Sequence, residues 1–227
     1  MISRSNGNVL FLILIAVVLF AALSYAVTQS SRGGGNADSE VNTLTASRMF
    51  QYSTAIQHGL HKMQILNGCG DTDISFARDG DGGGYDHTPV QPDTCRIFHA
   101  DGGGVTYIES RSFHSSGTFI YLPNGISGVG DEDNSELLML YTDLDRGTCI
   151  AINNLAGITN PSGNPPVDAA GDPWSGVEFT GTYADGITGN GDFLQNTTGN
   201  EIQGQSFGCF ANAAETLYYY FYVLIER

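Results

Sequence analysis

The chain has 227 residues, of which 24 are acidic and only 9 are Lys or Arg, so its formal net charge at pH 7 is −15. Such an acidic surface repels phosphate backbones, which excludes nucleic acid as a partner. A hydrophobic content of 41% excludes a disordered chain, and the 30 glycines indicate a loop-rich domain with substantial β structure.

The first predicted element is an apolar helix close to the N-terminus. The sequence from Val9 to Leu23 is unbroken apolar residues, and it stays free of charge as far as Val27. A helix of that length would rise about 28 Å, close to the thickness of the hydrocarbon core of a bilayer. The sequence alone therefore predicts a membrane helix. The basic Arg4 marks its cytoplasmic side, so the acidic remainder of the chain is expected outside the cytoplasm.

Two conventional fates of this helix are compatible with the flanking residues. The run Ser24-Tyr25-Ala26 is a small-x-small cleavage site behind an apolar stretch, so a signal peptidase could cut after Ala26. That cut would release a secreted binding protein. Without any cut, the helix would stay as a plain anchor for an extracytoplasmic binding protein.

A third fate follows from the leader MISRSNG, which is short, basic and ends in glycine directly before the apolar run. This arrangement resembles the class III signal of type IV pilins and type II secretion pseudopilins. In that family a prepilin peptidase cuts after the glycine, so the resemblance implies a cut between Gly7 and Asn8. The family usually has glutamate at the fifth mature position, which is Leu12 here. This departure implies a minor subunit rather than a major one.

The resemblance also implies how such a subunit would work and where it would be. The retained helix would lie in the inner membrane with the domain in the periplasm, or in an extracellular filament. Its partners would be other pilin-like subunits, the prepilin peptidase and, through the N-terminal helix, the membrane. The residues implied to pack in this assembly helix are Val9, Leu12, Ile15, Leu19 and Leu23.

The glycines after the apolar run predict a break in the helix. Three consecutive glycines, Gly33 to Gly35, cost roughly 3 kcal/mol of helix propensity relative to alanine. Beyond them, apolar residues such as Met49, Ile56 and Met63 recur at helical spacing, and Gly68 is a natural stop. The expected divisions are a leader at 1–7, a transmembrane and assembly helix at 8–32, a glycine hinge at 33–37, an amphipathic helix at 38–68 and an extracytoplasmic globular domain at 69–227.

Four cysteines are expected to form disulfide bonds within that domain. No two of them form a C-x-x-C pair, and their even number downstream of an export-type segment predicts two disulfides. Three pairings are possible, and the sequential pairing is favoured; the residues are Cys69, Cys95, Cys149 and Cys209. The expected fold class is α+β: a long N-terminal membrane helix with a glycine break, then a disulfide-containing, loop-rich, mainly antiparallel β domain of pilin-like type.

Later elements are predicted from pattern alone. A second helix is expected at Asp143–Ala156. The last strand has apolar residues on both faces, which is typical of a central strand covered on both sides, although its tyrosines could instead form a partner surface. The predicted strands are Val105–Glu109, Thr118–Leu122, Leu137–Thr142, Val177–Tyr183 and Leu217–Ile225.

Calcium is the candidate cofactor, and no catalytic motif points to an enzyme. The residues Asp79, Asp81 and Asp86 lie on a glycine-rich loop where carboxylates and carbonyls could converge on Ca²⁺. The alternative is a set of solvated turns. His58 and His61 lie three apart on the predicted amphipathic helix, but no neighbouring Cys or carboxylate completes a metal site, which favours exposed or packing histidines.

Overall fold

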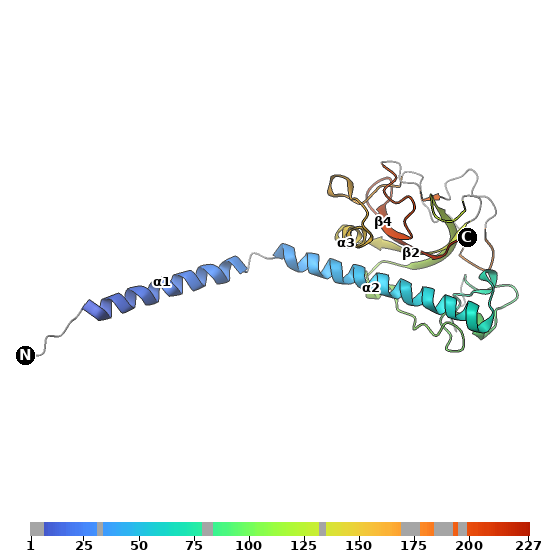
Figure 1. Ribbon diagram of the computed structural model, residues 1–227, viewed down its shortest axis with the longest axis horizontal. Coiled ribbons are helices and arrows are strands. Elements are labelled where there is room, and N and C mark those ends of the chain that lie inside the picture. The colour runs from blue at the N-terminus through green and yellow to red at the C-terminus, as the bar shows by residue number, and fades with distance from the viewer. Residues whose placement is uncertain are drawn as a thin grey trace, which may run out of the picture. The chain divides into compact units, whose positions relative to one another are not determined.

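The computed structural model describes residues 7–30, 34–78, 84–131, 135–168, 178–183, 193–194 and 199–227. It divides into two compact units, Met1–Val41 and Asn42–Arg227. The first unit contains helix α1 (Gly7–Ser30) and the beginning of helix α2 (Gly34–Lys62), and the second contains every other helix and strand that is described (Figure 1).

The prediction of a fold class with an N-terminal membrane helix must be corrected. The structure does place a helix there, α1, but none of the helices in the described residues has both the length and the apolar character needed to cross a membrane. The fold class is therefore an α+β arrangement without that element.

Helix α2 begins earlier than its sequence pattern predicts. It starts at Gly34, inside the stretch 33–37 expected to be a hinge, and Gly33 itself lies outside the described residues. Glycine has a low helix propensity, but each residue added to an existing helix gains a backbone hydrogen bond. This gain can extend a helix through adjacent glycines. The predicted end is confirmed: a π-helical turn, η1 (Met63–Asn67), follows α2, and Gly68 caps it with φ of 68°.

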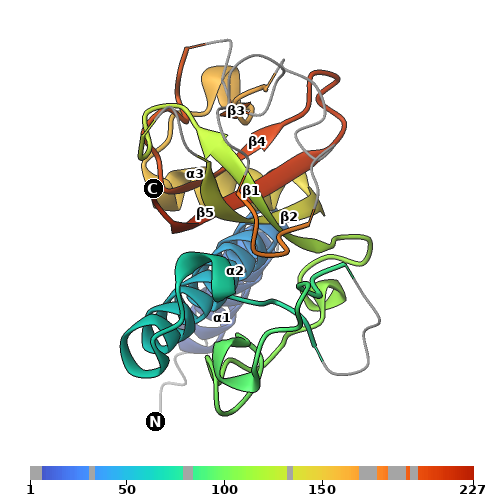
Figure 2. The same ribbon diagram turned by 90° about the vertical axis from the view of Figure 1, so that its right-hand side faces the viewer.

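The second unit is built on one twisted sheet with the strand order β3-β1-β2-β5-β4 (Figure 2). Four of its strands are antiparallel to their neighbours, and the two-residue β3 is parallel to β1. The strands are β1 (Phe119–Ile126), β2 (Glu136–Leu144), β3 (Phe193–Leu194), β4 (Phe207–Ala211) and β5 (Tyr218–Ile225). The remaining helices are α3 (Arg146–Ala156) and the short 3-10 turns η2 (Asp71–Asp73), η3 (Asp93–Cys95), η4 (Ser110–Ser112) and η5 (Pro161–Gly163).

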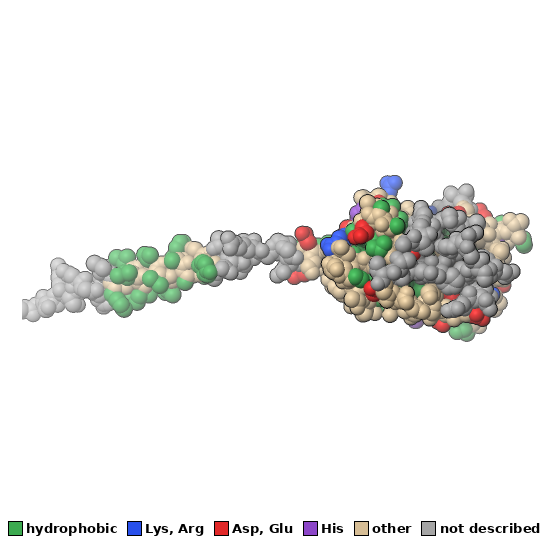
Figure 3. All heavy atoms as spheres, turned by 90° about the horizontal axis from the view of Figure 1, so that it is seen from above, with side chains coloured by type: hydrophobic (Ala, Val, Ile, Leu, Met, Phe, Trp, Pro, Cys, Tyr) green, Lys and Arg blue, Asp and Glu red, His purple; other side chains and the backbone are tan. Residues whose placement is uncertain are grey.

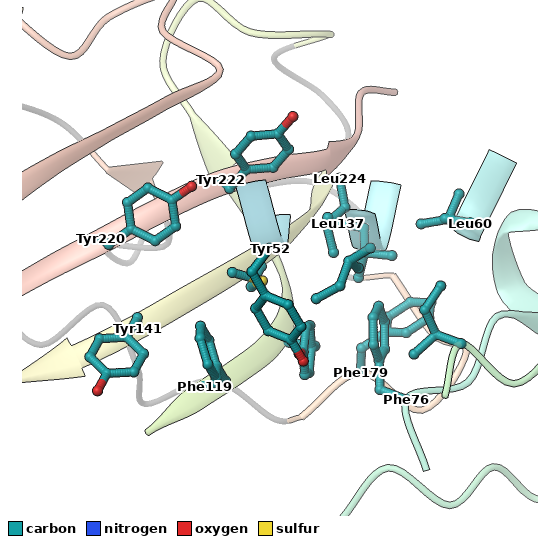
Figure 4. Close-up of a cluster of buried hydrophobic side chains, with 14 of the residues drawn as sticks. Tyr52, Leu60, Phe76, Phe119, Leu137, Tyr141, Phe179, Tyr220, Tyr222 and Leu224 are labelled. Carbon is teal, nitrogen blue, oxygen red and sulfur yellow. The ribbon is translucent and has the colours of Figure 1, made fainter. Parts of the chain in front are cut away.

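The sheet has a buried core on both faces. On one face α2 packs across β2 and β5, and the aromatic rings of Tyr52, Tyr141 and Tyr220 lie in the same cluster as Leu60 and Leu224 (Figure 4). On the other face, a second cluster joins the sheet to the segments after α3 and before β4; its members include Leu138, Ile158, Ile202, Phe210 and Phe221.

The prediction for the last strand is confirmed. β5 lies between β2 and β4, and its residues alternate between the two clusters: Tyr220 and Tyr222 face α2, whereas Tyr219 and Phe221 face the opposite side. All four of these rings are buried, so the tyrosine row is core. The alternative of an exposed tyrosine surface is therefore wrong.

Two predicted strands are wrong. Residues 105–109 are irregular, because the backbone N–H of Ile108 donates to the hydroxyl of Tyr52 on α2 (3.3 Å). Residues 178–183 are also irregular, although Phe179 N–H donates to the carbonyl of Tyr121 on β1 (2.9 Å). Both segments contain β-favouring residues, but their packing partners are side chains and isolated backbone groups instead of a continuous strand.

Candidate functional site

Helix α1 presents a continuous apolar surface to its surroundings. Successive residues of an α-helix are turned by about 100°, so the uninterrupted run of large apolar residues from Phe11 to Ile15 covers every side of the helix. Leu19 is 64% exposed and Phe20 is 73% exposed. Figure 3 shows hydrophobic side chains along the visible face of the described part of α1. A helix that is hydrophobic all round normally lies buried, so this apolar surface is a candidate binding interface.

The residues predicted to assemble lie on this surface as far as they are described. The side chains of Leu12, Ile15, Leu19 and Leu23 are all exposed on α1. Gly7 and Asn8 form the first residues of the helix, and Val9 follows them. The side chains of Asn8 and Val9 lie outside the described residues.

Within the second unit, α2 is fixed to the sheet by buried polar contacts as well as by apolar packing. The hydroxyl groups of Ser53 and Tyr220 lie 2.8 Å apart, and the Tyr222 hydroxyl donates to Gln57 Oε1 at 2.9 Å. Burial raises the pKa of Tyr220 well above its ordinary range, so this phenol stays neutral. Helix α2 from Asn42 onward is therefore one body with β5 and cannot shift without breaking these contacts.

Two disulfides hold the same unit together, in the sequential pairing that the sequence favoured. Cys69 follows the capping Gly68 and is bonded to Cys95 in η3, with the Cα atoms 5.8 Å apart. Cys149 in α3 is bonded to Cys209 in β4, with the Cα atoms 5.3 Å apart. The first bond ties the end of α2 to the following loops, and the second ties α3 to the sheet.

The structure does not bring a calcium site together in the residues that it describes. Asp79 and Asp81 lie outside those residues, and Asp86 is exposed. No group of three or more His, Cys, Asp or Glu side chains suited to a metal occurs in the described part of the chain. Calcium binding at Asp79, Asp81 and Asp86 therefore stays a prediction. Both His58 and His61 are exposed.

A groove that the sequence did not reveal lies between α2 and the loop 103–113. Its volume is about 720 Å³, and three basic side chains line it, Arg48, His58 and Lys62, with no acidic side chain beside them. The floor depends on Gly59, where a Cβ atom would lie 2.6 Å from Cγ2 of Val105. The available signal was a glycine inside an amphipathic helix, which often marks a close approach of another segment.

Glu136 is a second feature that sequence reasoning missed. It begins β2, its side chain is 1% exposed, and one carboxylate oxygen, Oε2, accepts from Ile126 N–H at 3.3 Å. The other oxygen, Oε1, has no hydrogen-bond partner in the described residues. Burial raises the pKa of Glu136 to about 7, so its ionisation depends on pH near neutrality.

Comparison with protein-family models, with curated proteins and with solved structures finds no match to this chain.

Proposed function

We propose that the chain is a minor structural subunit of a filament of the type IV pilus or type II secretion pseudopilus kind. The observation that carries this proposal is the exposed apolar surface of α1, which covers every side of the helix from Phe11 to Ile15. Assembly would occur by lateral packing of α1 helices from several copies or from related subunits. The basic leader that ends in Gly7 supports the same function, because cleavage there would leave the apolar helix on the mature chain.

The physical driving force would be burial of apolar side chains. Complete burial of a Leu, Ile, Val or Phe side chain stabilises by roughly 1.5–3 kcal/mol. Several such side chains per copy would meet the entropic cost of association, because α1 is already a helix before it binds. The second unit, closed by two disulfides, would then be displayed outside the cytoplasm at the filament surface.

One test is a charge placed on the apolar surface. In the full chain, Leu19→Glu should abolish self-association, because each contact would bury an unpaired carboxylate. The matched control is Ile65→Glu, since Ile65 is also an exposed apolar residue but lies in η1. Analytical ultracentrifugation in mild detergent would measure the size distribution. Assemblies that persist in Leu19→Glu would overturn the proposal.

A second test is the mature N-terminus in the native host. Mass spectrometry should find a chain that starts at Asn8, as the resemblance to pilin leaders implies. A chain that starts at Val27 has lost most of α1 and would contradict the proposal. An intact Met1 would contradict processing by a prepilin peptidase and favour an anchored binding protein.

A further inference from the structure

The groove between α2 and the loop 103–113, called here the basic groove, is positive in a chain that is otherwise acidic. The whole chain has 24 acidic residues against 9 Lys and Arg, yet the lining includes Arg48, His58 and Lys62 and no carboxylate. Neither Arg48 nor Lys62 forms a salt bridge within the described residues. The two charges are therefore available to a carboxylate that enters from outside.

The inner side of the basic groove is apolar. Tyr52 is 4% exposed and forms part of the floor, with Val105, Ile108 and Phe113 partly buried beside it. The guanidinium of Arg48 lies 5.3 Å from the centre of the Phe113 ring, where it can meet an incoming anion while it stays over the ring. An occupant should therefore carry apolar side chains for the floor and carboxylates for the rim.

One segment of the same sequence has this combination. Near the start of α2, Val41 is 61% exposed and Leu44 is 62% exposed. With Ala37 they are spaced by four and three residues, so they share one side of the helix. The acidic residues Asp38 and Glu40 are exposed in the same turns. The stretch Ala37–Leu44, called here the acidic segment, thus offers an apolar stripe flanked by two carboxylates.

We propose that the basic groove of one copy binds the acidic segment of a second copy. The mode is a helix laid in a groove, with Val41 and Leu44 on the apolar floor and the flanking carboxylates near Lys62 and Arg48. This inference rests on the proposed function, in which several copies assemble through α1 into a filament. The contact then joins two different surfaces, and such a heterologous contact repeats from copy to copy into an open filament.

Site-specific cross-linking of the full chain tests the contact directly. Ala55 is exposed and lines the basic groove, so it can be replaced by the photo-crosslinker benzoylphenylalanine. With a mixture of isotopically labelled and unlabelled copies, mass spectrometry should place the inter-copy cross-links within Ala37–Leu44. The control position is Leu155, which is 50% exposed on α3 and should give no cross-link to that segment. Cross-links elsewhere from Ala55, or none, would overturn the proposal.

Charge reversal gives the second measurement. The variants Glu40→Lys and Lys62→Glu should each lower the cross-linking yield roughly threefold, as expected for a lost exposed ion pair. The double variant E40K/K62E restores opposite charges and should recover the yield. Equal yields in the single and double variants would contradict the pairing of these two residues.

The two proposals fail in different ways. If Leu19→Glu abolishes assembly but the Ala55 cross-links of the otherwise native chain map elsewhere, α1 drives assembly and the basic groove has another role. If the cross-links reach the acidic segment while Leu19→Glu assembles normally, the groove contact is correct and assembly through α1 is wrong.

Discussion

Ser53 on α2 and Tyr220 on β5 are separated by 167 residues in the sequence, yet their hydroxyl oxygens lie 2.8 Å apart with both side chains fully buried. Ser53 Oγ also lies 2.9 Å from the Met49 carbonyl one turn earlier and donates to it, so it can accept from Tyr220. This pair connects the long helix to the central strand of the sheet, and it does so inside the apolar core.

We predict that the two hydroxyl groups are energetically coupled. Tyr220→Phe should lower the free energy of unfolding by about 1 kcal/mol, because it removes one buried hydrogen bond. Ser53→Ala should lower it by about 2 kcal/mol, because it also removes the hydrogen bond to the Met49 carbonyl. The double variant should lose about 1 kcal/mol less free energy of unfolding than the sum of the losses in the two single variants. Denaturant unfolding with the disulfides intact measures these values.

The control for this cycle is Tyr218→Phe. The Tyr218 hydroxyl donates to the exposed carbonyl of Glu215 (3.3 Å), so its loss should change the free energy of unfolding by less than about 0.5 kcal/mol. Strict additivity of Ser53→Ala and Tyr220→Phe would show that the buried contact contributes nothing.

A second prediction concerns the floor of the basic groove. In an exposed helix, Gly→Ala stabilises by about 1 kcal/mol, but a Cβ atom at position 59 would lie 2.6 Å from Cγ2 of Val105. We expect Gly59→Ala to lower the free energy of unfolding by about 1–2 kcal/mol, since the clash outweighs the gain in helix propensity. In a Val105→Ala background, the same change should be neutral or stabilising. Thermal unfolding compares the four proteins, and an unchanged cost of Gly59→Ala in that background would contradict the close contact.

A third prediction concerns pH. Burial raises the pKa of Glu136 from its ordinary value of 4.5 to about 7, so between these values the folded chain binds more protons than the unfolded chain. The contribution of this group to stability is therefore complete below pH 4.5 and is lost as the pH rises through 7. The loss amounts to about 3 kcal/mol at most.

Glu136→Gln should remove this dependence. The difference in unfolding free energy between native chain and variant should shift in favour of the variant as the pH rises from 5 to 8. The exposed Glu215→Gln is the control and should keep the native profile. A parallel pH profile for the native chain and Glu136→Gln would show that the buried carboxyl does not titrate in this range.

The fourth prediction concerns the disulfides. Bonds that close loops of 26 and 60 residues should stabilise by about 3.5 and about 4 kcal/mol in the chain-entropy model. The paired serine variants C69S/C95S and C149S/C209S should lose about these amounts in denaturant unfolding. Because a domain has only about 5–15 kcal/mol in total, removing both should leave it largely unfolded at 37 °C. Near-native stability of either variant would contradict this prediction.

Several features could be derived from the sequence, because local rules determine them. The αL conformation of Gly68 favours a residue without a Cβ atom, so the end of the helix at this residue was predictable. The two apolar faces of Leu217–Ile225 predicted a central strand, and the even number of cysteines predicted two disulfides. Each of these conclusions depends on neighbouring residues or on composition.

The features that the sequence did not reveal depend on distant contacts. Val105–Glu109 has strand propensity, but Ile108 N–H donates to the Tyr52 hydroxyl instead of to a neighbouring strand. The absence of a side chain at Gly59 lets Val105 pack against α2. The hinge at 33–37 was predicted from the low helix propensity of the glycines, whereas Gly34 is helical because α2 extends to it. The basic groove and the raised pKa of Glu136 exist only once separated segments meet. The sequence by itself determined the apolar helix, the presence of two disulfides and the acidic net charge, because these depend on composition and on neighbouring residues. Only tertiary packing decided that Arg48 and Lys62 line one groove and that the carboxyl group of Glu136 is buried, because these depend on segments that are far apart in the sequence.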